Sequence, residues 1–160
     1  MEEILLADLS NPVHANALVF LLNEYAKDDM GGGEELCDHV KLNLINELAQ
    51  RPGIHAVLAF VDQAPAGLAI CIEGFSTFAC KPLLNIHDLA VVSTFRGMGL
   101  ARLLLSRVEA LARELGCCKL TLEVLEGNQI AKAAYRSFGF AGYELGSASG
   151  KAEFWQKKLG

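Results

Sequence analysis

A turn containing two glycines at Arg96–Ala101 constrains the fold of this chain more than any other segment. The preceding run, Leu83–Val92, is apolar like a buried strand, and Leu100–Leu115 after it has apolar residues at helical spacing. Gly97 and Gly99 lack a Cβ atom, so the backbone can bend there and approach a ligand closely. The helix would direct its free N–H groups and the positive end of its dipole at that ligand. The segment therefore predicts a site for a phosphate or pyrophosphate.

The spacing of these residues excludes two common nucleotide-binding loops. A dinucleotide fingerprint needs three glycines in G-x-G-x-x-G, and this turn has two. A Walker A loop ends in Gly-Lys-Ser/Thr, whereas Gly99 is followed by Leu100 and Ala101. The pattern that remains is Arg-x-x-Gly-x-Ala, beginning at Arg96. An ordinary glycine turn at the start of a helix would explain the same residues.

Motifs farther along the chain distinguish these two interpretations. A second apolar run, Lys119–Leu125, precedes a predicted helix that carries Asn128, Ala131 and Tyr135. In order and spacing, residues 83–143 resemble the GNAT acetyltransferases, whose hallmarks are the loop Gln/Arg-x-x-Gly-x-Gly/Ala and the helix pattern Asn-x-x-Ala-x-x-x-Tyr. The first half of the chain resembles the family much more weakly. The resemblance implies an N-acetyltransferase that uses acetyl-CoA.

Length and composition limit the class of protein. A chain of 160 residues with 52% hydrophobic and 21% charged residues is expected to form one globular domain, residues 1–160. A net charge of −5 argues against nucleic acid as a partner. The acidic start and the lack of an apolar run of about 20 residues predict a cytoplasmic protein that has no membrane segment. The cysteines lack C-x-x-C spacing and the histidines are scattered, so no metal site is expected.

The order of predicted elements indicates a mixed α/β fold. Antiparallel strands come first and a strand–helix–strand unit follows. The GNAT resemblance implies a central mixed, mostly antiparallel sheet of six to seven strands flanked by four helices. The remaining predicted elements are a strand at Glu3–Ala7, a helix beginning at Asn11-Pro12, a helix at Glu34–Gln50, a hairpin of Ile54–Val61 and Ala66–Phe75, and final strands at Phe140–Leu145 and Ala152–Leu159.

The same resemblance implies where coenzyme A would bind. The pantetheine arm would pair like an extra strand with main-chain groups of the central strand, where that strand splays from its neighbour. An N–H group there could polarise the thioester carbonyl. The Arg96 side chain would add charge near phosphate, although a solvated surface arginine is the alternative. The implied cofactor contacts are Leu89, Val91, Val92, Arg96, Gly97, Met98, Gly99, Leu100, Ala101, Asn128, Ala131 and Tyr135.

Three residues are candidates for catalysis. Tyr135 matches the family tyrosine, and a phenol can donate a proton to a departing thiolate. His87 and Asp88 lie side by side on the central strand, at the place where spermidine/spermine acetyltransferase-like members carry an acidic pair. They face opposite sides unless a bulge intervenes. Either could be the base, and structural hydrogen bonding, Glu123 or a water remain alternatives.

The acceptor pocket is expected between the first two helices and the end of the third strand. Glu24, Tyr25 and Phe75, together with His87 and Asp88, could hold an alkylammonium group by charge and cation–π contact. The alternative interpretation is a solvated helix end together with core phenylalanines. The sequence 31–33 is Gly-Gly-Gly, which suggests a mobile lid.

The predicted reaction is direct transfer of an acetyl group from acetyl-CoA to a primary amine of a small molecule in a ternary complex. The alternatives are a protein lysine or N-terminal acetyltransferase and a non-catalytic coenzyme A-binding module. A homodimer is expected because many relatives dimerise.

Overall fold

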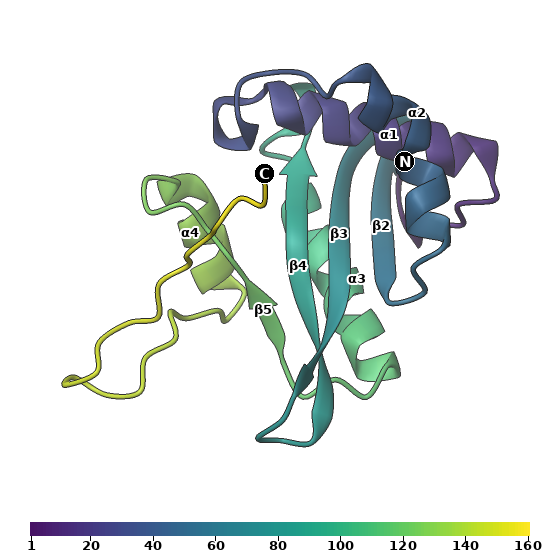
Figure 1. Cartoon of the computed structure of the whole chain (residues 1–160). Helices are drawn as coiled ribbons and strands as arrows, with labels where there is room; N and C mark the ends of the chain where they lie inside the picture. The colour runs from purple at the N-terminus through teal and green to yellow at the C-terminus, as the bar shows by residue number, and fades with distance from the viewer. The chain divides into compact units, whose positions relative to one another are not determined.

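The computed structural model describes residues 1–160 and divides them into two compact units, Met1–Leu122 and Glu123–Gly160. The second unit contains one helix, α4 (Gln129–Ser137). The first unit contains, in chain order, β1 (Glu2–Leu6), α1 (Pro12–Lys27), the 3₁₀ turn η1 (Asp29–Gly31), α2 (Asp38–Ala49), β2 (Ile54–Val61), β3 (Ala64–Ser76), β4 (Lys81–Val91), the 3₁₀ turn η2 (Ser93–Phe95), α3 (Leu100–Glu114) and β5 (Leu120–Leu122) (Figure 1).

The first unit is built around one mixed sheet in which the strands lie in sequence order from β1 to β5. The first four strands pair antiparallel, and β5 pairs parallel with β4. The long helix α3 forms the crossover between these two parallel strands, as parallel strands require. The predicted mixed, mostly antiparallel α/β architecture is therefore confirmed.

Helices cover both faces of this sheet (Figure 1). On one face, Leu18 and Leu21 of α1 pack in a core cluster with Leu58 and Leu68 of β2 and β3. On the other face, α3 brings Leu104 against Gly67 of β3, where an added Cβ atom would lie 3.1 Å from the leucine. The buried face of α3 consists of Leu100, Leu104, Leu105, Val108, Leu111 and Ala112. Leu103 is apolar too, but it lies outside this face and is 38% exposed.

Local signals placed several element ends correctly. Asn11 caps α1, with its side-chain oxygen accepting from the Val13 N–H at 2.9 Å. Gly116 has a φ of 71° and follows the end of α3, as a helix stop does. The predicted four-residue connection between β2 and β3 is a tighter turn in which Asp62 and Gln63 both have positive φ, so β3 begins at Ala64 instead of Ala66, while β2 has its predicted bounds.

The predicted start of the second helix at Glu34 is wrong, because α2 begins at Asp38. The intervening residues are held by tertiary contacts rather than by helical hydrogen bonds. The N–H of Leu36 donates to the Asn23 side chain of α1 at 2.9 Å, and the N–H of Glu34 donates to the Ala26 carbonyl at 3.2 Å.

The second unit lacks the two predicted final strands, so the sheet has five strands instead of six to seven. Only an isolated bridge joins Glu144 to Lys151. A strand is defined by hydrogen bonds to a neighbouring strand, and these residues have no such neighbour. Their apolar side chains also remain outside the core: Phe154 is 74% exposed and Trp155 is 81% exposed. Across the structure, no helix combines the length and apolar character that crossing a bilayer requires.

Candidate active site

A β-bulge in β4 resolves how His87 and Asp88 are oriented. Ile70 of β3 pairs with Asp88 and its neighbour Cys71 pairs with Ile86, so His87 is the extra residue with no partner on β3. The His87 side chain is exposed, and Asp88 is partly buried. The bulge therefore separates an accessible imidazole from a carboxyl group that has lost part of its solvation.

Asp88 lies on the face of the sheet that α1 covers. Ala90 and Val92, which follow Asp88 at strand alternation, pack against the α1 core cluster. The pKa of the Tyr25 phenol on α1 is raised by burial and then by the charges of Asp88 and Asp28. Burial raises the pKa of Asp88 itself, and the charge of His87 opposes that rise. A carboxylate with a raised pKa is a stronger proton acceptor than a fully solvated one.

The pairing between β4 and β5 ends where this bulge begins. It comprises the three pairs Leu84–Leu120, Asn85–Thr121 and Ile86–Leu122, whereas β4 continues to Val91. The Val92 N–H donates to Ala66 on the β3 side at 2.9 Å, so by strand alternation the main-chain groups of Leu89 and Val91 point toward the opposite edge. An exposed strand edge can accept an extended ligand as an additional strand.

The turn between β4 and α3 has the backbone that an anion site needs. Gly97 and Gly99 have φ values of 81° and 80°, in the left-handed region that favours glycine. A Cβ atom added at either glycine would meet no atom within 4 Å, so the backbone here borders open space. Gly99 is the N-cap of α3 and provides no side-chain cap, which leaves the first N–H groups of the helix available.

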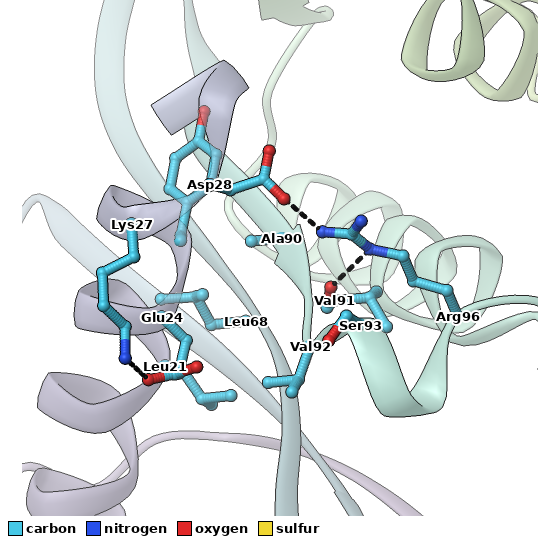
Figure 2. Close-up of a pocket in the computed structure, with 11 residues that line it drawn as sticks. Leu21, Glu24, Lys27, Asp28, Leu68, Ala90, Val91, Val92, Ser93 and Arg96 are labelled. Carbon is cyan, nitrogen blue, oxygen red and sulfur yellow. Dashed lines mark hydrogen bonds and ion pairs between the residues drawn. The ribbon is translucent and has the colours of Figure 1, made fainter. Parts of the chain in front are cut away.

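Arg96 directs its side chain away from this turn. Its Nη2 atom donates to Oδ2 of Asp28 at 2.6 Å, and its Nε atom donates to the Val91 carbonyl at 3.2 Å. The hydrogen bond from Arg96, a bond from the Met30 N–H and the charge of Arg96 lower the pKa of Asp28. The first residue of the Arg-x-x-Gly-x-Ala motif is thus bonded to the residue that caps the C-terminal end of α1 (Figure 2).

Beneath this ion pair lies a cavity of about 210 Å³ between α1 and the end of β4. Figure 2 shows Glu24, Lys27 and Asp28 on the α1 side, and Ala90 and Val91 on β4. Glu24 and Lys27 form an ion pair one helical turn apart. The remaining lining residues are Leu21, Tyr25, Leu68, Val92, Ser93 and Arg96. A cavity with apolar walls, paired charges and a phenol suits a small polar ligand.

The structure brings together only some of the predicted site residues. Glu24 and Tyr25 line the cavity, and Asp88 acts electrostatically on Tyr25. Phe75 pairs with Pro82 toward the far end of β3, about 23 Å along the strand from the cavity-lining Leu68. Both main-chain groups of Val92 already have partners, the N–H with Ala66 and the carbonyl with Phe95 at 2.9 Å.

Three predicted residues, Asn128, Ala131 and Tyr135, belong to the second unit. Asn128 caps α4 by accepting from the Ala131 N–H at 3.1 Å. The ring of Tyr135 meets that of Phe140 edge to face at 5.9 Å. Their roles in catalysis and cofactor binding stay predictions.

Sequence reasoning missed Asp28 as a partner of the cofactor motif. The two residues are 68 positions apart, so no local pattern joins them. The available signal was the charge of Asp28 shortly before the glycine run that starts at Gly31, which places a carboxylate at a helix end. No group of three or more histidine, cysteine, aspartate or glutamate side chains could hold a metal ion.

Comparison with known proteins places these features in context. The sequence profile of the acetyltransferase (GNAT) family matches residues 18–140. A thialysine N-epsilon-acetyltransferase from Caenorhabditis elegans is 31% identical over 124 residues, which cover 78% of this chain and 75% of that protein.

Among solved structures, that of a probable acetyltransferase superposes with a TM-score of 0.82 at 19% identity, covering 99% of this chain and 98% of the other. The aminoglycoside N-acetyltransferase AAC(6')-Iy in complex with CoA gives a TM-score of 0.73 at 17% identity, covering 99% and 96%. At these identities the likeness shows the fold.

Proposed function

We propose an acceptor substrate for this chain, which belongs to the GNAT family and is an acetyl-CoA-dependent N-acetyltransferase. The proposed acceptor is a small molecule with a primary amine. The thialysine N-epsilon-acetyltransferase relative is named for such an acceptor, which supports this class of substrate. The amine would enter the cavity between α1 and β4, where Glu24, Tyr25 and Asp28 provide carboxylate and phenol groups. Spermidine-like acceptors are one option within this class.

The observation that carries the proposal is the bulge at His87, directly after the last residue that β4 pairs with β5. In the proposed reaction His87 and Asp88 would accept the proton at this bulge, from an amine bound on the side of the sheet that α1 covers. An imidazole can accept a proton near neutral pH, and partial burial makes Asp88 a better acceptor. We assign His87 and Asp88 the role of taking the proton from the acceptor ammonium, directly or through a water.

The cofactor side of the proposal depends on the edge of β4 and the following turn. Acetyl-CoA supplies the thioester whose acetyl group is transferred. Leu89 and Val91 direct main-chain groups toward the open edge and would hold the extended arm, Val91 through its N–H because its carbonyl accepts from Arg96. The N–H groups of Gly97, Met98, Gly99, Leu100 and Ala101 would hold the pyrophosphate at the uncapped start of α3.

Tyr135 is assigned the role of the acid. A phenol is protonated at neutral pH and can donate to the sulfur as the thiolate leaves. Asn128 and Ala131 on the same α4 segment are assigned to the cofactor arm. A single 1–160 domain, a homodimer and a cytoplasmic location complete the proposal. Light scattering of the purified chain tests the dimer.

An acetylation screen tests the acceptor class. The purified chain is incubated with acetyl-CoA and with polyamines, lysine analogues, aminoglycosides or lysine-containing peptides, and both released thiol and acetylated product are measured. The proposal requires product with at least one small amine and with His87→Ala reducing turnover. Product formed with peptides alone would favour a protein acceptor. Binding of acetyl-CoA without any product would favour a non-catalytic module.

A further inference from the structure

The guanidinium group of Arg96 joins three elements of the first unit. It binds Asp28 at the end of α1 at 2.6 Å and the Val91 carbonyl at the end of β4 at 3.2 Å, while its own backbone begins the turn to α3. Figure 2 shows both bonds above the cavity. A planar guanidinium with several fixed donors suits this kind of bridging, which an ammonium would not reproduce.

Asp28 in turn organises the glycine-rich turn that follows α1. Its side chain accepts from the Met30 N–H at 3.1 Å, and its carbonyl accepts from Gly31 and Gly33 at 2.8 and 3.1 Å. A Cβ atom at Gly31 would lie 1.9 Å from the Tyr25 carbonyl oxygen, so this turn is folded tightly against the end of α1. The position of the turn therefore depends on where Asp28 is held.

The bridge is too exposed to be explained by fold stability alone. The side chains of Arg96 and Asp28 are 58% and 29% exposed. Exposed ion pairs contribute little to stability because solvent screens them. Both residues nevertheless line the cavity, so the geometric effect of the pair falls on that cavity.

We propose that Arg96 is a positioning residue of the acceptor pocket: it holds Asp28, and through Asp28 the Gly31–Gly33 turn, beside the cavity. Arg96, the first residue of the proposed cofactor loop, thereby helps to set the shape of the cavity proposed for the acceptor. The assignment of the cavity to the acceptor rests on the proposed function. The link from Arg96 to the turn rests on the hydrogen bonds alone.

Hydrogen exchange and steady-state kinetics test this link on the full chain. In Arg96→Gln and in Asp28→Asn, the amides of Gly31 and Gly33 are expected to exchange faster, since their acceptor carbonyl is released. The acceptor KM is expected to rise about tenfold in either variant, while the Kd for acetyl-CoA stays unchanged. The double variant is expected to show the same exchange rates and the same acceptor KM as either single variant, because each substitution removes the same Arg96–Asp28 interaction.

Two controls make the result specific. Arg113→Gln removes another exposed arginine pair, with Glu109 of α3, and is expected to change none of these quantities. Arg96→Lys is expected to recover part of the acceptor KM because it keeps the charge. Unchanged exchange of Gly31 and Gly33 in both Arg96→Gln and Asp28→Asn would overturn the proposal.

The outcome also separates this proposal from the proposed function. Faster exchange in the two variants without acetylation of any amine would retain the positioning role and reject the acceptor assignment. Weaker acetyl-CoA binding in Arg96→Gln with unchanged exchange would instead make Arg96 a phosphate ligand and reject the positioning role.

Discussion

The Tyr25 phenol on α1 and the Asp88 carboxyl group on β4 lie on the same face of the sheet, and the pKa of the phenol is raised by burial and next by the charge of Asp88. Tyr25 lines the cavity between α1 and β4. A protonated phenol beside a carboxylate with a raised pKa gives the pocket a hydrogen-bond donor and a proton acceptor at neutral pH. Such a combination suits an amine that must be bound and then deprotonated.

Replacing Asp88 with asparagine is expected to stabilise the fold at neutral pH and to reduce turnover. Burial raises the pKa of Asp88 above its value in the unfolded chain, so the native state binds the proton more tightly. The wild-type free energy of unfolding should therefore fall as pH rises between the unfolded and folded pKa values, and this loss should be absent in Asp88→Asn. Unfolding measured as a function of pH checks the prediction.

Asp28→Asn is the matched control for that measurement, because Arg96 lowers the pKa of Asp28. Its stabilising contribution is present above the unfolded pKa and is lost as pH falls through the folded pKa. Asp28→Asn should therefore lower stability at neutral pH, by a small amount for an exposed pair. If both variants changed the free energy of unfolding at neutral pH by the same amount and in the same direction, the burial of Asp88 and the ion pair of Asp28 would not have the opposite effects assigned to them.

Replacing Gly99 with alanine is expected to destabilise the fold by about 1–2 kcal/mol, the usual cost of a left-handed backbone for a residue with a Cβ atom. Open space surrounds Gly99, so this cost is conformational and not steric. Gly99→Asn should cost less, because asparagine tolerates this region. Thermal unfolding measures the first effect, and calorimetric titration with acetyl-CoA should show weaker binding as the turn shifts.

Gly127→Ala provides the comparison for Gly99→Ala. Gly127 also borders open space, and its φ lies outside the left-handed region. This variant should leave stability and acetyl-CoA affinity close to wild type. If Gly99→Ala behaves in the same way, the backbone of the turn has no special role.

Tyr135→Phe is expected to lower kcat by about 10²-fold with little change in the Kd for acetyl-CoA, as loss of a general acid does. The substitution keeps the ring contact with Phe140, so α4 should retain its structure. Single-turnover kinetics and calorimetry measure the two quantities. A parallel loss of turnover and affinity would show that Tyr135 mainly positions the cofactor.

His87→Ala is expected to lower kcat by about 10²-fold, because the variant has lost a group that can accept the proton of the acceptor ammonium. The bulge is a property of the backbone register and should persist in this variant. Steady-state kinetics at saturating acceptor are the appropriate measurement. An unchanged kcat would assign the proton transfer to Asp88 or to a water.

The sequence determined those features whose causes lie within a few residues. Asn11-Pro12 predicted the start of α1, because capping and backbone preference act locally. The amphipathic spacing of Leu100–Leu115 likewise predicted a helix packed on the sheet. The family motifs added the acetyl-CoA-dependent chemistry, which no periodicity could have supplied.

The tertiary structure decided the features that depend on distant partners. The register between β3 and β4 determined that His87 is the bulged residue and that Asp88 faces α1. The folding of α1 onto β4 brought Asp28 to Arg96 across 68 positions. Residues 140–159 have strand-like composition, yet they form no strand, because pairing requires a neighbouring edge that composition does not provide. Local signals fix where elements begin and end, whereas register and long-range contacts fix which side chains share a pocket.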